Sequence, residues 1–140
     1  LLATLFPYTT LFRSRIQRRS DRRHLPPDQD RIVIIEQRTY TLGPGALPRF
    51  LAAYESLGLP AHRDIYQRLA GYFVSETGVL NQVVHQWAFE SFEDRNTRRG
   101  RLQRDPRWQQ YLEQVQGLVV QQESRLLRPM PWSPTVQPLG

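Results

Sequence analysis

The side chains best suited to chemistry lie on two stretches predicted to be strands. His85 and Trp87 alternate with small or aliphatic residues in one stretch, and Arg38 and Tyr40 occupy alternate positions of the other. Because alternate residues of a strand point to the same side, each pair is expected on one face of a sheet. Histidine can accept a proton near neutral pH, and arginine can stabilise a developing anion. We therefore take His85 and Arg38 as candidate catalytic residues.

The same residues suggest a binding pocket. Aromatic rings beside a guanidinium suit a small organic or acidic ligand, because the rings supply apolar surface and the cation attracts negative charge. Simpler roles stay open: cross-strand pairing of Arg38 and Glu36 with other charges, a hydrogen-bonded sheet residue for the histidine, and a core position for the tryptophan. The predicted ligand-binding residues are Arg38, Tyr40, Tyr72, His85 and Trp87.

The spacings that mark common catalytic and metal sites are absent from the sequence. It has no glycine-rich phosphate loop, no G-x-S-x-G and no H-E-x-x-H. It has no cysteine, which excludes disulfides and thiolate metal ligands. His24, His62 and His85 are scattered along the chain. We expect neither a metal nor a cofactor, and the sequence leaves open whether the protein is an enzyme.

Hydrophobic periodicity predicts an α+β domain. Alternating β-branched residues indicate strands, and apolar residues spaced by three and four indicate helices. Ser91 followed by Asp94 marks a helix start, and Asp105 with Pro106 restarts that helix. The predicted strands cover 32–42, 70–77, 81–91 and 118–127, and the predicted helices cover 47–57, 61–68 and 91–115, with Gly58 and Pro60 separating the first two. This order is that of a ferredoxin-like βαββαβ sandwich.

In such a sandwich both helical regions cover one face of the sheet. We predict that Val33, Ile35, Val84 and Ala88 lie beneath the helices. The opposite face then carries Glu36, Arg38, Tyr40, His85 and Trp87. An exposed face with this aromatic content favours packing against another subunit. We therefore predict a homodimer that closes a barrel and binds its ligand between the two sheets.

Charge gives little support to other partners. The 140 residues carry a formal charge of +6, and all nineteen basic residues are arginine, which indicates a G+C-rich genome. The arginines between positions 95 and 107 suit a solvated helix face better than a nucleic-acid surface. An RNA-recognition domain shares the element order, but VVHQWAF at 83–89 lacks the base-stacking pattern and Glu36 would repel phosphate. No apolar run is long enough for a membrane span, and we expect a cytoplasmic protein.

The N-terminal segment is set apart from the domain. Residues 4–14, TLFPYTTLFRS, resemble the translation of a sequencing adapter, and residues 15–30 are arginine-rich without apolar periodicity. Asp21, Asp28 and Asp30 weigh against an organelle transit peptide. We therefore expect 1–30 to be disordered and non-native, 31–134 to form the domain, and 135–140 to be a C-terminal tail.

Four segments resemble the NIPSNAP family in order and spacing. They are IIEQRTYTLGPG at 34–45, GYFVSETGVLNQVVHQWAFESFEDR at 71–95, DPRWQQYL at 105–112 and QQESRLLRPMPWSP at 121–134. Gln37 and Gln86 stand where the family tends to have leucine, which predicts slightly looser packing beneath the helices.

The resemblance implies a homodimeric, dimeric α+β barrel domain, and we expect a bacterial member of uncharacterised role. The wider barrel superfamily includes cofactor-independent monooxygenases, haem-degrading enzymes and small-molecule isomerases. A fold shared with those enzymes supports the alternative of a cofactor-independent monooxygenase or isomerase only by analogy.

Overall fold

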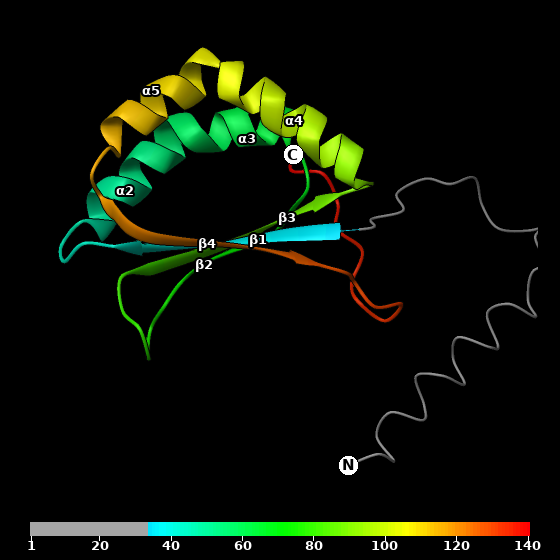
Figure 1. The fold of residues 1–140 in the computed structure, drawn as a ribbon, viewed down its shortest axis with the longest axis horizontal. Helices are drawn as coiled ribbons and strands as arrows, with labels where there is room; N and C mark the ends of the chain where they lie inside the picture. Colours follow the sequence, from blue (N-terminus) through cyan, green and yellow to red (C-terminus); the bar gives the residue numbers. More distant parts are fainter. Residues whose placement is uncertain (1–33) are drawn as a thin grey trace, which may run out of the picture. The chain divides into compact units, whose positions relative to one another are not determined.

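The chain builds a four-stranded antiparallel sheet with a layer of helices on one of its faces (Figure 1). The structure is a computed structural model and describes residues 34–140. The strands are β1 (Ile34–Leu42), β2 (Leu69–Val74), β3 (Gln82–Phe89) and β4 (Val119–Leu127). The helical elements are α2 (Leu47–Ala53), the π-helical turn η3 (Tyr54–Gly58), α3 (Leu59–Ile65), α4 (Phe92–Arg104) and α5 (Pro106–Gln114).

The strand order in the sheet is β2-β3-β1-β4, with β1 antiparallel to both β3 and β4. Arg38 at the centre of β1 lies opposite His85 on β3 and Ser124 on β4. The predicted ferredoxin-like βαββαβ arrangement is confirmed. The first two residues of the first predicted strand, and the segment 1–30 expected to be disordered, lie outside the described residues.

Gly58 and Pro60 do not separate two helices, contrary to the sequence prediction. α2, η3 and α3 follow one another without a break, because the N–H of Leu59 bonds to the carbonyl of Tyr54 in a π-helical turn. Pro60 stands in the first turn of α3, where a missing N–H costs little. One continuous helical segment therefore runs along the sheet (Figure 1).

The start signals of the second helical region are confirmed. Ser91 Oγ accepts a hydrogen bond from the Asp94 N–H at 3.0 Å, and α4 begins at the next residue. The Asp94 carboxylate accepts from the N–H of Glu90 at 3.1 Å, one residue earlier than a capping box requires. Asp105 caps α5 by accepting from the Arg107 N–H at 2.8 Å.

The face of the sheet beneath the helices is the opposite of the predicted one. Two buried clusters fill the space between sheet and helices: Ile34, Trp87 and Phe89 with Ala61, Ile65, Tyr66 and Leu102, and Leu42 and Val83 with Phe50, Ala53, Tyr54, Tyr111 and Val115. Burial favours the face with the larger apolar side chains, and on β3 that face carries Val83, Trp87 and Phe89, whereas the opposite face carries Val84 and Ala88. Strand alternation then brings Glu36, Arg38 and His85 to the same side.

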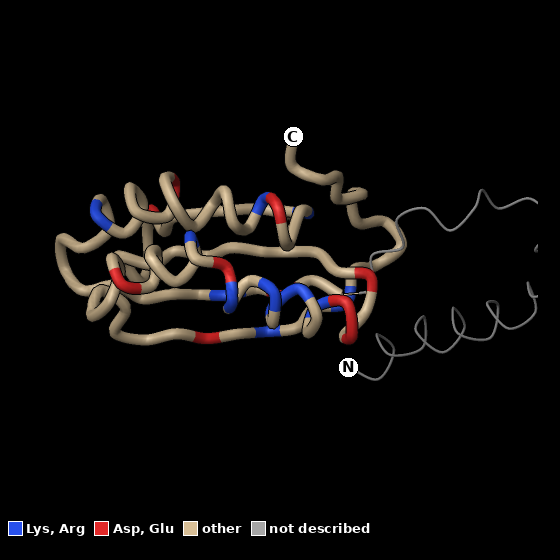
Figure 2. Tube along the Cα trace, turned by 90° about the horizontal axis from the view of Figure 1, so that it is seen from above, with Lys and Arg blue, Asp and Glu red and all other residues tan. Residues whose placement is uncertain are grey.

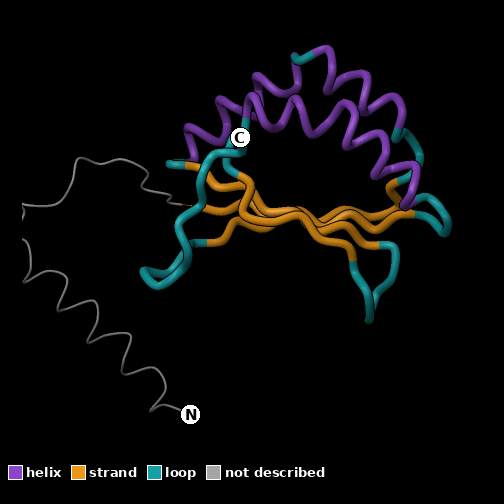
Figure 3. The backbone as a smooth tube through the Cα atoms, turned by 180° about the vertical axis from the view of Figure 1, so that it is seen from behind, coloured by secondary structure: helices purple, strands orange, loops and turns teal. Residues whose placement is uncertain are grey.

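No described helix lies on the other face of the sheet (Figure 1). It carries Phe73, which is 53% exposed, and a cross-strand pair in which Gln86 Nε2 donates to Gln37 Oε1 at 2.8 Å. The predicted loosening of the helix-side packing by these glutamines is wrong, because they lie on this far face and satisfy each other. The loop after β2 and the segment after β4 extend beyond the sheet on the same side (Figure 3).

The C-terminal residues return to the helix side. The Leu139 N–H donates to the Gln67 carbonyl at 2.7 Å, and the leucine side chain packs against the cluster around Trp87. Part of the expected tail 135–140 therefore contacts the core of the domain. Among residues 34–140, no helix has the length and apolar character needed to cross a bilayer.

Candidate functional site

A buried carboxylate links the sheet to the helix layer. Glu36 on β1 is 1% exposed. Its Oε1 accepts hydrogen bonds from Arg38 Nε at 3.0 Å, Arg95 Nη2 at 2.7 Å and Ser124 Oγ at 3.2 Å. Burial alone would raise the pKa of Glu36, but the Arg95 hydrogen bond and the Arg38 charge outweigh it and hold the pKa below its ordinary value. The carboxylate is therefore ionised at neutral pH.

This cluster carries an excess of positive charge. Two guanidinium groups, those of Arg38 and Arg95, face one carboxylate, which leaves one net positive charge. Arg38 also donates from Nη1 to Tyr40 Oη at 3.4 Å, and its Nη2 has no hydrogen-bond partner within residues 34–140. The Arg38 side chain is 20% exposed. The guanidinium is thus held through Nε and Nη1, and its Nη2 is unbonded within residues 34–140.

His85 lies beside this cluster and is neutral at pH 7. It stands opposite Arg38 in the sheet and is 3% exposed. Burial, assisted by the Arg38 charge, lowers the pKa of His85 to about 4. Trp87, two residues further along β3, donates from Nε1 to His85 Nδ1 at 3.0 Å. The imidazole is therefore an uncharged, oriented hydrogen-bonding group.

Aromatic rings surround this imidazole. Tyr72 stacks on His85 with ring centroids 5.3 Å apart and 11° between the planes, and Tyr40 lies at 5.3 Å with its ring tilted. Tyr54 in turn stacks on Tyr72 at 4.6 Å, and its hydroxyl lies 2.9 Å from His62 Nδ1. The set extends from the sheet into the helix layer.

Burial keeps these rings uncharged. It holds the pKa of His62 well below the ordinary histidine value, with a further contribution from His85. It raises the pKa of Tyr54 and Tyr72 above the ordinary tyrosine value. Both tyrosines are therefore hydroxyl donors at neutral pH and not phenolates.

The site approaches the surface beside the edge strand β4. Every residue of β4 after Val119 is exposed, so the described helices leave this edge open. Ser124, which bonds Glu36, stands on β4 opposite Arg38. Arg38 and Tyr40 are partly exposed, whereas Glu36 is buried. A ligand that enters along β4 would meet the arginine and the tyrosine first.

The structure brings the five predicted ligand-binding residues together, but on the helix-covered side of the sheet. A continuous series of hydrogen bonds and ring contacts joins Arg38, Tyr40, Tyr72, His85 and Trp87. The predicted placement of these residues between two sheets is wrong, because their face packs against the helices of the same chain. Their mutual proximity follows from the strand register and is unaffected by the choice of face.

Sequence reasoning missed several members of the site. Tyr54 and His62 are eight residues apart on one helical segment, a spacing of about two turns that puts both on the apolar face. Glu36 was predicted to share a face with Arg38 but was not included among the site residues. Arg95 was assigned to the solvated helix face, and no local signal connects it to a carboxylate 59 residues away.

Half of the arginines from position 95 to 107 are engaged with carboxylates. Besides Arg95, Arg98 pairs with Asp94 at 2.6 Å, and Arg107 pairs with Asp64 at 2.6 Å and with Asp105 at 2.8 Å. Acidic and basic positions are interspersed along the trace (Figure 2). This part of the surface is therefore not uniformly basic.

No metal centre is evident in the described part of the chain. Within residues 34–140, no three histidine, cysteine or acidic side chains are grouped so that they could hold an ion. The His62 and His85 rings lie 6.1 Å apart between centroids, and aromatic rings fill their surroundings. His24 lies outside the described residues.

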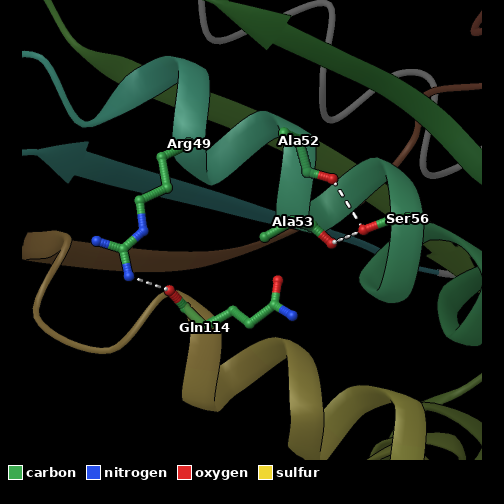
Figure 4. A pocket seen from close by; sticks show the side chains of 5 residues that line it. All are labelled: Arg49, Ala52, Ala53, Ser56 and Gln114. Carbon is green, nitrogen blue, oxygen red and sulfur yellow. Dashed lines mark hydrogen bonds between the residues drawn. The ribbon is translucent and has the colours of Figure 1, made fainter.

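A hollow of about 320 Å³ lies elsewhere, between the α2–η3 segment and α5 (Figure 4). Its lining residues are Arg49, Ala52, Ala53, Ser56 and Gln114. Arg49 Nη2 donates to the Gln114 carbonyl at 3.3 Å, and Ser56 Oγ donates to helical carbonyls. None of the five predicted site residues lines this hollow.

Comparison with solved structures defines the class of protein. An uncharacterized NIPSNAP-like domain protein from Burkholderia xenovorans superposes with a TM-score of 0.73 at 40% identity, covering 79% of this chain and 96% of that one. A putative antibiotic biosynthesis monooxygenase from Nitrosomonas europaea superposes with a TM-score of 0.54 at 8% identity, covering 69% and 98%. The second likeness shows the fold alone. The fold is that of the dimeric α+β barrel class.

The family follows from the sequence matches. The NIPSNAP family model matches residues 35–134. Human protein NipSnap homolog 3A is 33% identical over 109 residues, which are 76% of this chain and 43% of that protein. A NIPSNAP family protein with unknown function from Agrobacterium tumefaciens has a TM-score of 0.71 at 39% identity, covering 75% of this chain and 95% of that one. The chain belongs to the NIPSNAP family. It spans less than half the length of the curated relatives that it matches.

Proposed function

We propose that this NIPSNAP domain binds a small organic ligand with an acidic group, between its sheet and its helices, and that Arg38 is the anion anchor. The supporting observation is the Arg38 guanidinium, which is held by Glu36 and Tyr40 while its Nη2 has no partner within residues 34–140. Its positive charge is not fully compensated, since Arg95 shares the same carboxylate. A fixed cation beside apolar rings matches the usual make-up of small-molecule sites.

The other residues of the site have distinct roles in this proposal. Tyr40 and Tyr72 provide ring surface and hydroxyl donors on either side of His85. Trp87 closes the inner end, where it is 1% exposed. The ligand is therefore expected to be flat or aromatic on one side and to carry its negative charge toward β4.

The proposal includes a homodimer formed through the uncovered face of the sheet. Phe73 is more than half exposed there, and Ile35 and Val84 are only partly covered. Exposed apolar residues on one face of an antiparallel sheet favour the packing of a second sheet against that face. The similarity in fold to the dimeric α+β barrel class supports the same arrangement. Size-exclusion chromatography with light scattering tests it, and a monomer at all concentrations would rule it out.

A thermal-shift screen tests the binding function. Small carboxylic acids at about 100 times the dissociation constant should stabilise the protein by about 2.7 kcal/mol, which raises the melting temperature by several degrees. Arg38→Gln should abolish this rise. Arg125→Gln is the matched control, since Arg125 is 62% exposed on β4 and lies outside the site. If the acids raise the melting temperature of Arg38→Gln as well, the proposal is contradicted. It is also contradicted if no acid in the panel raises the melting temperature of the wild type.

A second candidate is a cofactor-independent monooxygenase or isomerase. It is favoured by an uncharged His85 directly opposite Arg38, an arrangement able to stabilise an enolate oxygen. The putative antibiotic biosynthesis monooxygenase from Nitrosomonas europaea lends support at the level of fold. Turnover of enolisable carboxylic acids, monitored by oxygen uptake and by solvent deuterium incorporation, should fall sharply in His85→Leu. Undiminished turnover would remove His85 from the chemistry.

A further inference from the structure

The hydrogen bond between Trp87 and His85 restricts the imidazole to one tautomer. Trp87 Nε1 can only donate, and it lies 3.0 Å from His85 Nδ1. A neutral imidazole has one N–H and one nitrogen with a free lone pair. The nitrogen facing Trp87 must be the acceptor. The proton of the neutral ring therefore belongs to Nε2.

The other nitrogen of His85 is unengaged. No residue within 34–140 makes a hydrogen bond with Nε2, whereas the ring plane is fixed by stacking against Tyr72. The indole N–H of Trp87 is buried in the core and has no other hydrogen-bond partner in the described residues. The indole therefore holds the orientation of a His85 N–H group that is itself unbonded.

We propose that Trp87 is a positioning residue that fixes His85 as an Nε2–H donor, so that the ligand must present an anionic or carbonyl oxygen to His85 and Arg38. This inference rests on the proposed binding function. At neutral pH the His85 ring is then a hydrogen-bond donor and not a base, because the lone pair of its Nδ1 already accepts the Trp87 hydrogen bond. In the second candidate function, His85 would accordingly stabilise an oxyanion rather than remove a proton.

The surroundings of His85 agree with a site built from donors. Arg38 contributes only N–H groups, and Tyr72 is a neutral hydroxyl. The nearest carboxylate, Glu36, has Oε1 occupied by two arginines and a serine, while its Oε2 is buried and unbonded within residues 34–140. A ligand ammonium would face the net positive charge of this cluster. A carboxylate or enolate oxygen would find matching groups.

Nuclear magnetic resonance of the ¹⁵N-labelled full chain measures the tautomer directly and without a ligand. Long-range ¹H–¹⁵N spectra at pH 7 should show a protonated Nε2 and an unprotonated Nδ1 for His85, with His85→Gln identifying the signals. Trp87→Phe should shift these signals toward a mixture of tautomers. A protonated Nδ1 in the wild type, or an unchanged spectrum in a folded Trp87→Phe protein, would overturn the inference.

The ligand class is tested with benzoate and benzylamine, two probes of similar shape and opposite charge. Benzoate should bind and benzylamine should not. His85→Leu should weaken benzoate binding by about tenfold or more, the loss expected for one hydrogen bond to a charged group. His85→Gln, whose amide can donate from a similar position, should retain most of the affinity. The comparison of the two His85 variants does not require a Trp87 variant to fold.

The outcomes separate the two proposals. Binding of benzylamine as tight as that of benzoate, or equal benzoate affinity in His85→Leu and wild type, would overturn the donor role while leaving a ligand site in place. Failure of both probes to bind would count against the ligand class and the proposed function together. The tautomer spectrum decides the role of Trp87 in every case.

Discussion

Arg95 on α4 places its Nη2 2.7 Å from Oε1 of Glu36 on β1, so that an ion pair crosses from the helix layer to the centre of the sheet. The two residues are 59 positions apart in the chain. The same carboxylate oxygen also binds Arg38, the proposed anion anchor. One buried carboxylate therefore contributes both to the attachment of α4 and to the orientation of Arg38.

Removal of the Glu36 charge should destabilise the domain. Glu36→Gln leaves two guanidinium groups without their counter-ion in a largely buried position, and breaking a buried ion pair in this way costs about 3 kcal/mol. The free energy of unfolding, measured by urea titration, should fall by that order.

The matched control is Glu123→Gln. Glu123 pairs with Arg125 on the exposed β4 strand, and loss of a surface pair changes stability by less than about 1 kcal/mol. Equal effects of the two substitutions would show that the Glu36 network does not hold the layers together.

The element order could be predicted from the sequence because it depends on local signals. The alternation in 32–42, the Ser91 cap and the Asp105-Pro106 start each act over a few residues. The face of the sheet could not be predicted in the same way. Both faces of β3 carry apolar residues, and the choice between them depends on packing against helical residues far away in the sequence, such as Phe50 and Tyr111.

The grouping of the site residues was predictable for a related reason. Cross-strand neighbours in an antiparallel sheet share a face once the register is set, so Arg38, Tyr40, Tyr72 and His85 had to lie together. The contributions of Arg95 and His62 depend on packing between layers, which alternation does not encode.

Acid should weaken the fold through its buried histidines. His85 has a pKa of about 4 in the folded protein, below its ordinary value, so unfolding takes up a proton at mildly acidic pH. Its contribution to stability is complete above about pH 6.5 and is lost as the pH falls toward 4, and this amounts to about 2 kcal/mol between pH 7 and 5. The pKa of His62 is also lowered, so it adds a loss of the same sign.

Urea titrations at pH 7, 6 and 5 measure this effect. His85→Gln should show a shallower fall of unfolding free energy with decreasing pH than the wild type, with the remaining slope coming from His62. The charged groups nearest His85, Arg38 and Glu36, keep their charges in this range. Parallel curves for the two proteins would contradict the assignment of a depressed pKa to His85.

Glycine 58 is required by the packing of the helix layer. A Cβ at Gly58 would lie 2.6 Å from Cδ2 of Tyr54, whose ring is buried between Tyr72 and Tyr111. Gly58→Ala should therefore destabilise the domain by about 1–3 kcal/mol, as overpacking does. Gly100→Ala in α4 is the opposite control, because only the end of Arg104 lies within 4 Å, and alanine should stabilise that helix by about 0.5–1 kcal/mol. Thermal unfolding of both variants shows whether packing or helix propensity decides the effect at each position. If both substitutions to alanine stabilise the protein, Gly58 has no packing role.

The glutamine pair on the far face should affect the proposed dimer. Gln37 and Gln86 bond to each other in the middle of the face that a second copy would cover. Replacement of one by leucine leaves the other amide unpaired and should weaken the dimer by about 1–3 kcal/mol. Replacement of both should be neutral or should strengthen it. Dissociation constants from analytical ultracentrifugation measure this, and unchanged constants in both single variants would place the pair outside the interface.

A crystal structure of the full chain with a carboxylic acid found in the thermal-shift screen would locate the ligand. We expect the carboxylate within hydrogen-bonding distance of Arg38, beneath the helices, with the rest of the ligand against Tyr72 and His85. A ligand bound on the other side of the sheet, against Phe73 and Gln86, or one that makes no contact with Arg38, would contradict it.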